Sequence, residues 1–417
     1  MMRRFLGALA ATVAATLATP AVTGAAVPGA PSCPMFPADS WWHADISQLP
    51  VHPMSSTYVS SMGSGKALKA DFGSGLWDGG PIGIPYTVVN GQPGISVTFD
   101  YADESDHVPY PIPPNPPIEG GPQSSGDRHV LIVDAGTCQL YELYAAYPNG
   151  NGGWTAGSGA TWNLNDNALR PDTWTSADAA GLPILPGLVR YDEVAAGYID
   201  HAIRVTASAT SRSYLWPARH QAGSNNDALP PMGLRIRLRP DLDLSGFPRD
   251  DQVILQAMKT FGLVVADNGS SWFVSGVPDE RWDNDVLQAL RNVKGQDFEA
   301  VDASSLMVSY DSGQAVGGVA APPPAPAAPA PEQQPQQQPQ AAAASTTAAP
   351  DTTAVSTTTT TLAPTTTTAA TGGRAAVAVR EGTDGGGGGW WWLLAVVAVL
   401  GSGAAVLFVR LKLRAAG

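Results

Sequence analysis

Residues 311–389 contain few large apolar side chains, and this tract limits where the chain can fold. Residues 320–344 are rich in Ala, Pro and Gln, and 14 of the 26 residues from 346 to 371 are Thr. Pro-rich segments favour extended conformations, and Thr-rich segments with Pro are typical of stalks that carry O-linked sugars. Because such a tract cannot bury a core, the sequence predicts a disordered stalk over 311–389.

Both ends of the chain carry signals of membrane export. Residues 1–26 combine two arginines, a short apolar run and small residues suited to cleavage, as in a secretory signal peptide. Residues 390–409 form an uncharged run that starts with three tryptophans and precedes the basic tail 410–417. We therefore predict a single-pass cell-membrane protein with one transmembrane helix over 390–409, a cytoplasmic tail and an extracellular N-terminal domain.

The remaining body, residues 33–310, is strongly acidic. It holds 31 Asp and Glu against 16 Lys and Arg, a net charge of −15, whereas the whole chain carries −13. This negative charge repels phosphate backbones, so no nucleic-acid partner is expected. The body is long enough to bury one sizeable core or two small ones fused together.

Cys33 and Cys138 are the only two cysteines of the chain, and both fall in the exported body. An even number of cysteines in an oxidising compartment predicts one disulfide. It would tie the start of the mature chain to the middle of the body. A catalytic thiol is the alternative interpretation, but no CxxC or metal-ligand spacing accompanies either cysteine.

Short β-branched and aromatic runs dominate the sequence between residues 83 and 238, and Pro, Gly or Asn clusters bound most of them. This pattern favours a mainly β fold of the sandwich or barrel type. The expected strands are 84–89, 95–99, 130–133, 140–144, 202–206 and 234–238.

A smaller α+β part is predicted over 246–302. Apolar residues at helical spacing predict a helix from Asp250 to Gly262 and a second one that starts near Pro278. Asn268-Gly269 between two apolar runs favours a β-hairpin of 263–265 with 272–274. A last strand is expected at 298–301.

No strong catalytic signature occurs, but His and Arg residues lie beside carboxylates near several expected strand ends. Such groups suit acid–base chemistry or hydrogen bonding to sugar hydroxyls. The candidate catalytic residues are Asp127, His129, Asp192, Glu193 and His201. Arg190 and Arg204 are the candidate substrate-binding cations.

Structural roles for these residues remain open. Asp127 and Arg128 could form an ion pair at a turn, and His201 could be a structural histidine. Asp192 and Glu193 are consecutive, so on a strand they would point to opposite faces and only one of them would reach a given site.

Three arginines, Arg235, Arg237 and Arg239, alternate with apolar residues. On a strand they would share one face, where cross-strand pairing with carboxylates is the expected arrangement. A basic stripe for an anionic polymer such as a uronic acid is the alternative.

No metal or cofactor is expected from a specific motif. Calcium is the one candidate, because the acidic segments 103–106 and 241–243 offer oxygen ligands, although neither matches an EF-hand loop. Solvated acidic turns are the other interpretation of both segments.

The body contains nine tryptophans, and three of them, Trp154, Trp162 and Trp174, lie in loop-like sequence rich in Gly, Asn and Thr. Exposed aromatic rings stack on the apolar faces of sugars. These three are therefore candidate substrate-binding residues. Buried anchors that hold long loops are the alternative.

The segments CPMFPADSWWHADIS, GDRHVLIVD, RYDEVAAGYIDHAIRVT and ADNGSSWF resemble a group of exported bacterial domains to which no activity is attached. The resemblance covers most of residues 33–301. It implies one continuous exported module and identifies no catalytic residue.

These patterns together predict a carbohydrate-active ectodomain that cleaves or binds a polysaccharide or cell-wall glycan. If it cleaves, Asp192 or Glu193 would pair with Asp127 as the two carboxylates. A non-catalytic adhesin or wall-spanning structural protein is the second hypothesis, because it explains the stalk and the missing signature.

Overall fold

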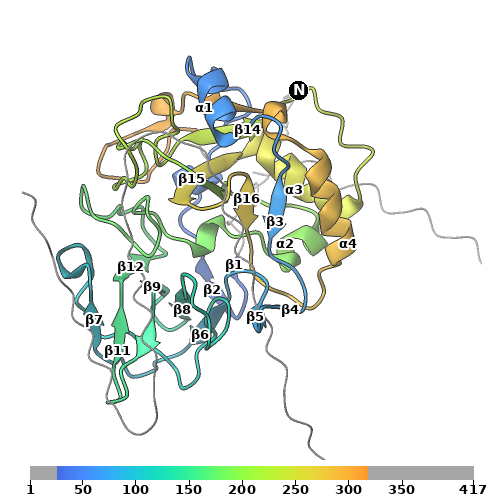
Figure 1. Ribbon diagram of the computed structural model, residues 1–417. Helices are drawn as coiled ribbons and strands as arrows, with labels where there is room; N and C mark the ends of the chain where they lie inside the picture. The colour runs from blue at the N-terminus through green and yellow to red at the C-terminus, as the bar shows by residue number, and fades with distance from the viewer. Residues whose placement is uncertain (1–25, 318–417) are drawn as a thin grey trace, which may run out of the picture. The chain divides into compact units, whose positions relative to one another are not determined.

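The computed structural model describes residues 26–317, which belong to one compact unit of the chain. These residues form a β-rich fold with few helices, as the strand patterns predicted (Figure 1). The helices between residues 26 and 317 are all too short or too polar to cross a bilayer. The predicted membrane span, most of the signal peptide and most of the stalk lie outside the described residues.

The largest sheet is mixed and has six strands. Its order is β17-β14-β15-β13-β16-β3, with bounds Phe298–Val301, Arg235–Leu238, Leu263–Asn268, Ile203–Ala207, Phe273–Ser275 and Lys69–Asp71. β13 runs parallel to β15, whereas β14 is antiparallel to both of its neighbours.

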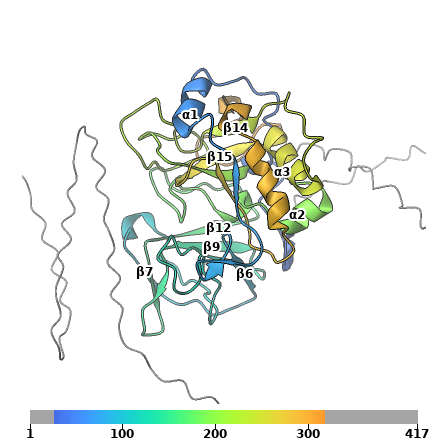
Figure 2. The same cartoon turned by 45° about the vertical axis from the view of Figure 1, so that its right-hand side comes forward.

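A four-stranded sheet fills the other half of the unit (Figure 2). Its order is β12-β9-β8-β6, with bounds Ser158–Asn163, Gln139–Tyr144, Val130–Asp134 and Tyr86–Val89. β8 is buried on both faces: Leu131 and Val133 belong to the main core, and Val130 and Ile132 belong to a second, smaller core. This sheet therefore separates the two cores.

Three smaller sheets complete the strands. They are β10-β11-β7 (Tyr147–Pro148, Trp154–Ala156, Val97–Phe99), β1-β2 (Ala26–Val27, Ala30–Pro34) and β4-β5 (Leu76–Trp77, Gly80–Pro81). The two larger sheets each have two edge strands, so neither closes into a barrel.

Four α-helices occur among the described residues: α1 (Ser55–Met62), α2 (Tyr191–Ala196), α3 (Arg249–Thr260) and α4 (Asn284–Leu287). The 3-10 helices are η1 (Trp41–His43), η2 (Ala102–Glu104), η3 (Leu185–Gly187), η4 (Gln288–Asn292), η5 (Gly295–Asp297) and η6 (Ser304–Leu306). The prediction of the α3 helix is confirmed, and its apolar face, which includes Ile254 and Met258, is buried. The second predicted helix begins later, where the Asp283 carboxylate accepts the backbone N–H groups of Asp285 and Val286.

The predicted hairpin around Asn268-Gly269 is wrong. β15 and β16 follow one another in the chain, but β13 lies between them in the sheet. A type I′ turn needs positive φ at both central residues. Neither Asn268 nor Gly269 has it, and the left-handed residue of this connection is Trp272, with φ of 66°.

The predicted disulfide between Cys33 and Cys138 is present. The body also extends past the predicted start of the stalk. The Gly313 carbonyl accepts the Trp41 N–H at 2.8 Å, and residues 312 and 314 form β-bridges with Ala168 and Ser40. Residues 312–315 are therefore part of the folded unit.

Candidate functional site

Two adjoining cavities are lined by several titratable side chains. The first, here called the acidic cavity, has a volume of about 180 Å³. Its charged lining residues are Asp71, Glu119, Asp127, His129, Arg204 and Asp267. The second, here called the tyrosine cavity, has a volume of about 460 Å³ and is lined by Tyr101 and Tyr144 among others. Asp127 and Asp267 line both, so the two cavities meet at these carboxylates.

A β-bulge places Asp267 in the acidic cavity. β13 and β15 pair in regular register up to Val205, and then the register shifts so that Thr206 lies opposite Asp267. Arg204 and Thr206 are two residues apart and share one face of β13. Without the shift, Asp267 would lie opposite Ala207 and point to the other face. The bulge therefore brings the Asp267 carboxylate to the face that carries Arg204.

Arg204 is buried and bound to carboxylates. Its Nε and Nη2 donate to the two carboxylate oxygens of Asp178, each at 2.7 Å, and Nη2 also lies 3.0 Å from Asp267 Oδ2. Its Nη1 donates to Ser275 Oγ at 2.7 Å. The guanidinium is held by these groups. Arg204 therefore organises the cavity, whereas the sequence had suggested a substrate-binding residue.

The Asp267 carboxyl favours its protonated form. Burial, together with the negative charge of Asp178, raises the pKa of Asp267 to about 8. The nearby Arg204 acts in the opposite direction but does not compensate. The Asp267 side chain is 19% exposed, so it is a neutral acid at pH 7 that solvent can reach.

Glu119 has the opposite tendency. Its Oε2 lies 2.6 Å from Nδ1 of His129, whose Nε2 faces the Ala177 carbonyl at 3.1 Å. Burial would raise the pKa of Glu119, but the charge and hydrogen bonds of His129 outweigh it and lower the pKa. In turn, burial opposes the charged form of His129, but Glu119 raises its pKa to about 9. Glu119 is 25% exposed, so it is a carboxylate that faces the cavity.

The acidic cavity therefore holds two carboxyl groups whose pKa values are shifted apart. A neutral acid and an ionised carboxylate in one cavity are the requirements of general acid catalysis with charge stabilisation. His129 is not free to act as a base, because both ring nitrogens are engaged. It holds Glu119 in place instead.

Asp127 is exposed at the junction of the two cavities. It forms no ion pair with Arg128, which was one sequence interpretation. The buried Arg128 guanidinium donates to the backbone carbonyls of Ala146, Pro122 and Ser124. The Asp127 carboxylate is thus available to a ligand in either cavity.

The other predicted catalytic residues form a separate cluster around α2. Glu193 pairs with the Arg190 guanidinium and lies 3.2 Å from His201 Nε2, and it also accepts the Arg190 backbone N–H. These three side chains are buried and line neither cavity. The five candidate catalytic residues therefore do not lie in one site: Asp127 and His129 line the acidic cavity, whereas Glu193 and His201 form a buried ion-paired cluster elsewhere.

The cluster has a structural explanation. Residues 191–196 form a helix, not the strand on which the face argument for Asp192 and Glu193 was based. Glu193 closes the first turn of this helix by capping the Arg190 N–H. Asp192 is half-exposed beside Arg190, at 3.9 Å, and outside both cavities.

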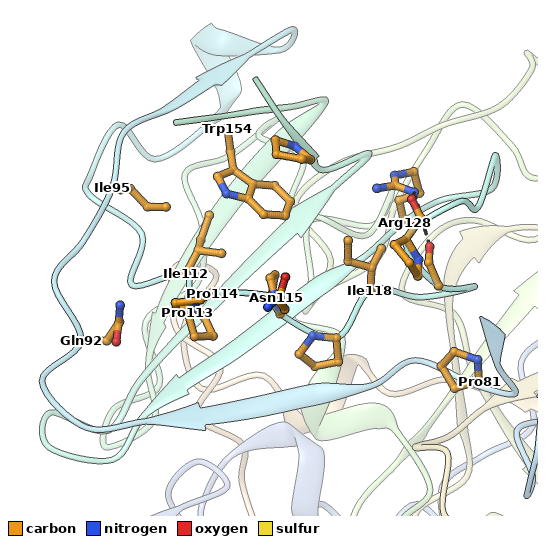
Figure 3. Close-up of a pocket in the computed structure, with 15 residues that line it drawn as sticks. Pro81, Gln92, Ile95, Ile112, Pro113, Pro114, Asn115, Ile118, Arg128 and Trp154 are labelled. Atoms are coloured by element: carbon orange, nitrogen blue, oxygen red, sulfur yellow. Dashed lines mark hydrogen bonds between the residues drawn. The ribbon is translucent and has the colours of Figure 1, made fainter. Parts of the chain in front are cut away.

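The three predicted sugar-binding tryptophans line neither the acidic nor the tyrosine cavity. Trp162 is buried and Trp174 half-buried, and both rings lie beside the guanidinium of Arg170, at 5.7 and 5.4 Å. Trp154 lines a third cavity of about 720 Å³ together with a series of prolines, here called the proline cavity (Figure 3). Most of its lining prolines belong to the segment 113–117.

The arginine stripe of β14 is not an anion-binding surface. Arg237 forms the expected cross-strand pair with Glu299 at 2.8 Å, and Arg239 contacts Asp241. Arg235 is buried and donates to backbone carbonyls, including that of Phe261 at 2.7 Å. Burial lowers the pKa of Arg235 to about 9.

The predicted calcium segments make internal contacts. Asp106 binds Arg170 and the Thr161 N–H, and the Asp243 carboxylate accepts from Ser245. Between residues 26 and 317, no group of three or more His, Cys, Asp or Glu side chains is arranged to hold a metal ion.

The pH dependence of stability follows from these shifts. The pKa of Asp267 is raised to about 8, that of His129 to about 9, and burial raises that of Glu142 to about 7. A group whose pKa is raised in the folded state stabilises the folded protein at low pH. This stabilisation is lost as the pH rises through the pKa of that group in the folded state. The lowered pKa of Glu119 has the opposite effect: its contribution to stability is lost as the pH falls in the acid range.

Asp267 and Glu142 bind protons more tightly in the folded state from about pH 4 upward, and His129 does so from about pH 6.5. We therefore expect the melting temperature to be highest near pH 4–5, roughly, and to fall steadily from there to about pH 9. Thermal unfolding followed by circular dichroism over a pH series measures this. A melting temperature that is flat or rising over the same interval would contradict the pKa assignments.

The sequence had pointed to Asp127, His129 and Arg204, and had missed Glu119, Asp178 and Asp267. Asp267 precedes Asn268-Gly269 and was part of a turn signal, and Glu119 follows a proline-rich segment without other polar motifs. The local sequence of neither residue marks it as functional. Comparison of the whole chain with protein-family models, curated proteins and solved structures finds no match.

Proposed function

We propose that the protein is a surface-anchored extracellular enzyme that cleaves glycosidic bonds in the acidic cavity. The observation that carries this proposal is the pair of carboxyl groups with opposite pKa shifts, Asp267 raised and Glu119 lowered, in one cavity. Glycoside hydrolysis requires such a pair, one to donate a proton and one to remain ionised.

Asp267 is the general acid of the proposed reaction. It donates its proton to the glycosidic oxygen while the bond from that oxygen to the anomeric carbon breaks. The ionised Glu119 faces the positive charge that develops at this carbon. Water then supplies a hydroxyl group to the carbon and returns a proton to Asp267. Arg204 and His129 are positioning residues, because they act through Asp267 and Glu119.

The tyrosine cavity supports a sugar substrate. Its aromatic residues Tyr101 and Tyr144 offer ring faces, and the side chains of Glu104, Asp127 and His220 offer hydrogen bonds to hydroxyl groups. Carboxylates outnumber the cations around both cavities, and Arg204 is already bound by Asp178. This charge distribution favours a neutral or amino-sugar glycan over a uronic-acid polymer.

The location of the enzyme is part of the same proposal. A signal peptide over 1–26, a Thr- and Pro-rich tract and an uncharged run over 390–409 support a body held outside the membrane by an extended stalk. A body on such a stalk would reach glycans of the cell wall or the surroundings.

The test is release of oligosaccharides. The full-length protein is incubated with a panel of neutral, amino-sugar and uronic-acid polysaccharides, and products are followed by mass spectrometry. The Glu119→Gln variant should lose product formation at least 100-fold, and Glu280→Gln, an exposed glutamate outside the cavities, should match the wild type. Equal release by Glu119→Gln would refute the assignment, and no release by any protein would favour the non-catalytic adhesin.

A further inference from the structure

The hairpin β4–β5 carries two large apolar side chains into solvent. Leu76 is 71% and Trp77 is 78% exposed. Among the tryptophans of residues 26–317, Trp77 is the one whose side chain is mostly exposed; the others are buried or half-buried. Exposing an indole costs the free energy of its burial, so an exposed Trp77 suggests a binding role.

The hairpin is held in a defined position. Asp78 and Gly79 both have positive φ, of 51° and 85°, as the favoured two-residue hairpin turn requires. At the base, the Gly73 N–H donates to the Ile82 carbonyl at 3.0 Å. The side-chain amide of Asn284 binds both the N–H and the carbonyl of Ser74, each at 3.0 Å. Trp77 is thus presented on an anchored element.

The same hairpin packs directly on the loop that carries Glu119. A Cβ atom at Gly80 would lie 2.0 Å from the carbonyl carbon of Gly120, and one at Gly121 would lie 3.0 Å from the Gly79 oxygen. Only glycines allow this backbone approach. The hairpin, in which Trp77 pairs with Gly80, is therefore fixed against the residue that follows Glu119, and Glu119 itself lines the acidic cavity.

On its other side, the hairpin borders the proline cavity. Pro81, the last residue of β5, lines that cavity, and so does Ile118, the residue before Glu119 (Figure 3). Ile118 and Glu119 are consecutive but line different cavities. One loop thus separates the acidic cavity from a large apolar hollow, and the Trp77 hairpin is bound to that loop.

We propose that Trp77 forms an accessory platform that binds a polysaccharide chain next to the cleavage site. The class of ligand, a polysaccharide, is taken from the proposed function, and the inference rests on it. A pyranose ring stacks its apolar face on an indole, and a polymer that continues from the acidic cavity past Glu119 meets this ring. Short oligosaccharides that fill only the acidic and tyrosine cavities would not reach it.

A binding experiment tests the platform without requiring cleavage. Full-length Glu119→Gln protein, with and without Trp77→Ala, is mixed with insoluble cellulose, chitin, xylan and peptidoglycan, and the retained fraction is measured. Trp77→Ala should weaken retention on the bound polymer about tenfold. Trp77→Tyr should restore most of it, and Val308→Ala, which truncates another exposed apolar side chain, should change nothing.

Two further measurements separate this proposal from its alternatives. In the active protein, Trp77→Ala should raise the KM for the polymer about tenfold and leave that for a trisaccharide unchanged. If Trp77→Ala still cleaves the polymer with unchanged retention and unchanged KM, the proposed role of Trp77 is wrong, but the proposed enzymatic function stands.

Discussion

Asp267→Asn should reduce glycan turnover by about 10²–10⁴-fold, because an amide cannot donate the proton that the departing sugar oxygen requires. The variant should fold normally. Asparagine keeps the shape of the side chain, and its amide oxygen can still accept from Arg204 Nη2, as Asp267 Oδ2 does at 3.0 Å. The exposed Asn268 N–H, which donates to Oδ1 at 2.7 Å, then turns to water. Initial rates of product release with saturating polymer measure the effect.

Two controls make this result specific. The exposed Asp243 undergoes the same chemical change in Asp243→Asn and should retain wild-type rates. Since the acid must be protonated, wild-type turnover should decline above about pH 8, the pKa of Asp267. A turnover rate that Asp267→Asn leaves within a factor of three would contradict the general-acid role. So would a rate that still rises above pH 9.

Arg204→Met should destabilise the folded state by about 3–5 kcal/mol, the largest loss of stability that we expect from one substitution in the body. The Asp178 carboxylate is fully buried and is neutralised by Arg204 through two bonds of 2.7 Å. Removing the cation leaves this charge uncompensated. Urea unfolding at pH 7, followed by tryptophan fluorescence, measures the change.

The double variant Arg204→Met/Asp178→Asn distinguishes charge from packing. Once the buried carboxylate is also neutralised, most of the lost stability should return. Arg239→Met, which breaks an exposed pair with Asp241, should have no measurable effect. If the double variant were as unstable as Arg204→Met, the destabilisation would come from lost packing instead.

Local sequence patterns were sufficient for α3 and for about half of the strands, but β11 and β12, which carry Trp154 and Trp162, lie in sequence with a loop-like pattern. The continuous apolar run of β8, the alternation in β9 and the helical spacing in 253–258 depend on neighbours within a few residues, so they could be recognised without tertiary information. The disulfide was predictable because only two cysteines exist. α2 was missed because its six residues carry too short a pattern and depend on the Glu193 cap and on burial.

The candidate site was only half predictable. His129 and Arg204 stood out because they lie close to carboxylates in the sequence, at or near the ends of expected strands. The role of Asp267 depends on the register shift between β13 and β15, and a shift of one residue reverses the face on which a side chain lies. The lowered pKa of Glu119 depends on a contact with His129, which lies ten residues later in the sequence. Neither relation can be inferred from one sequence.

The last folded residues also have a mechanical consequence. The Gly313 carbonyl and the Ala315 N–H bind the backbone of Trp41 and Asp39, each at 2.8 Å. A few residues before Asp39, Cys33 is covalently joined to Cys138, at the start of β9. Tension applied to the chain after residue 317 would therefore load these hydrogen bonds, together with the one from the Val316 N–H to the Leu306 carbonyl. The segment around Asp39 and Trp41 that receives this force is joined covalently to the four-stranded sheet, so it stays attached there after the hydrogen bonds break.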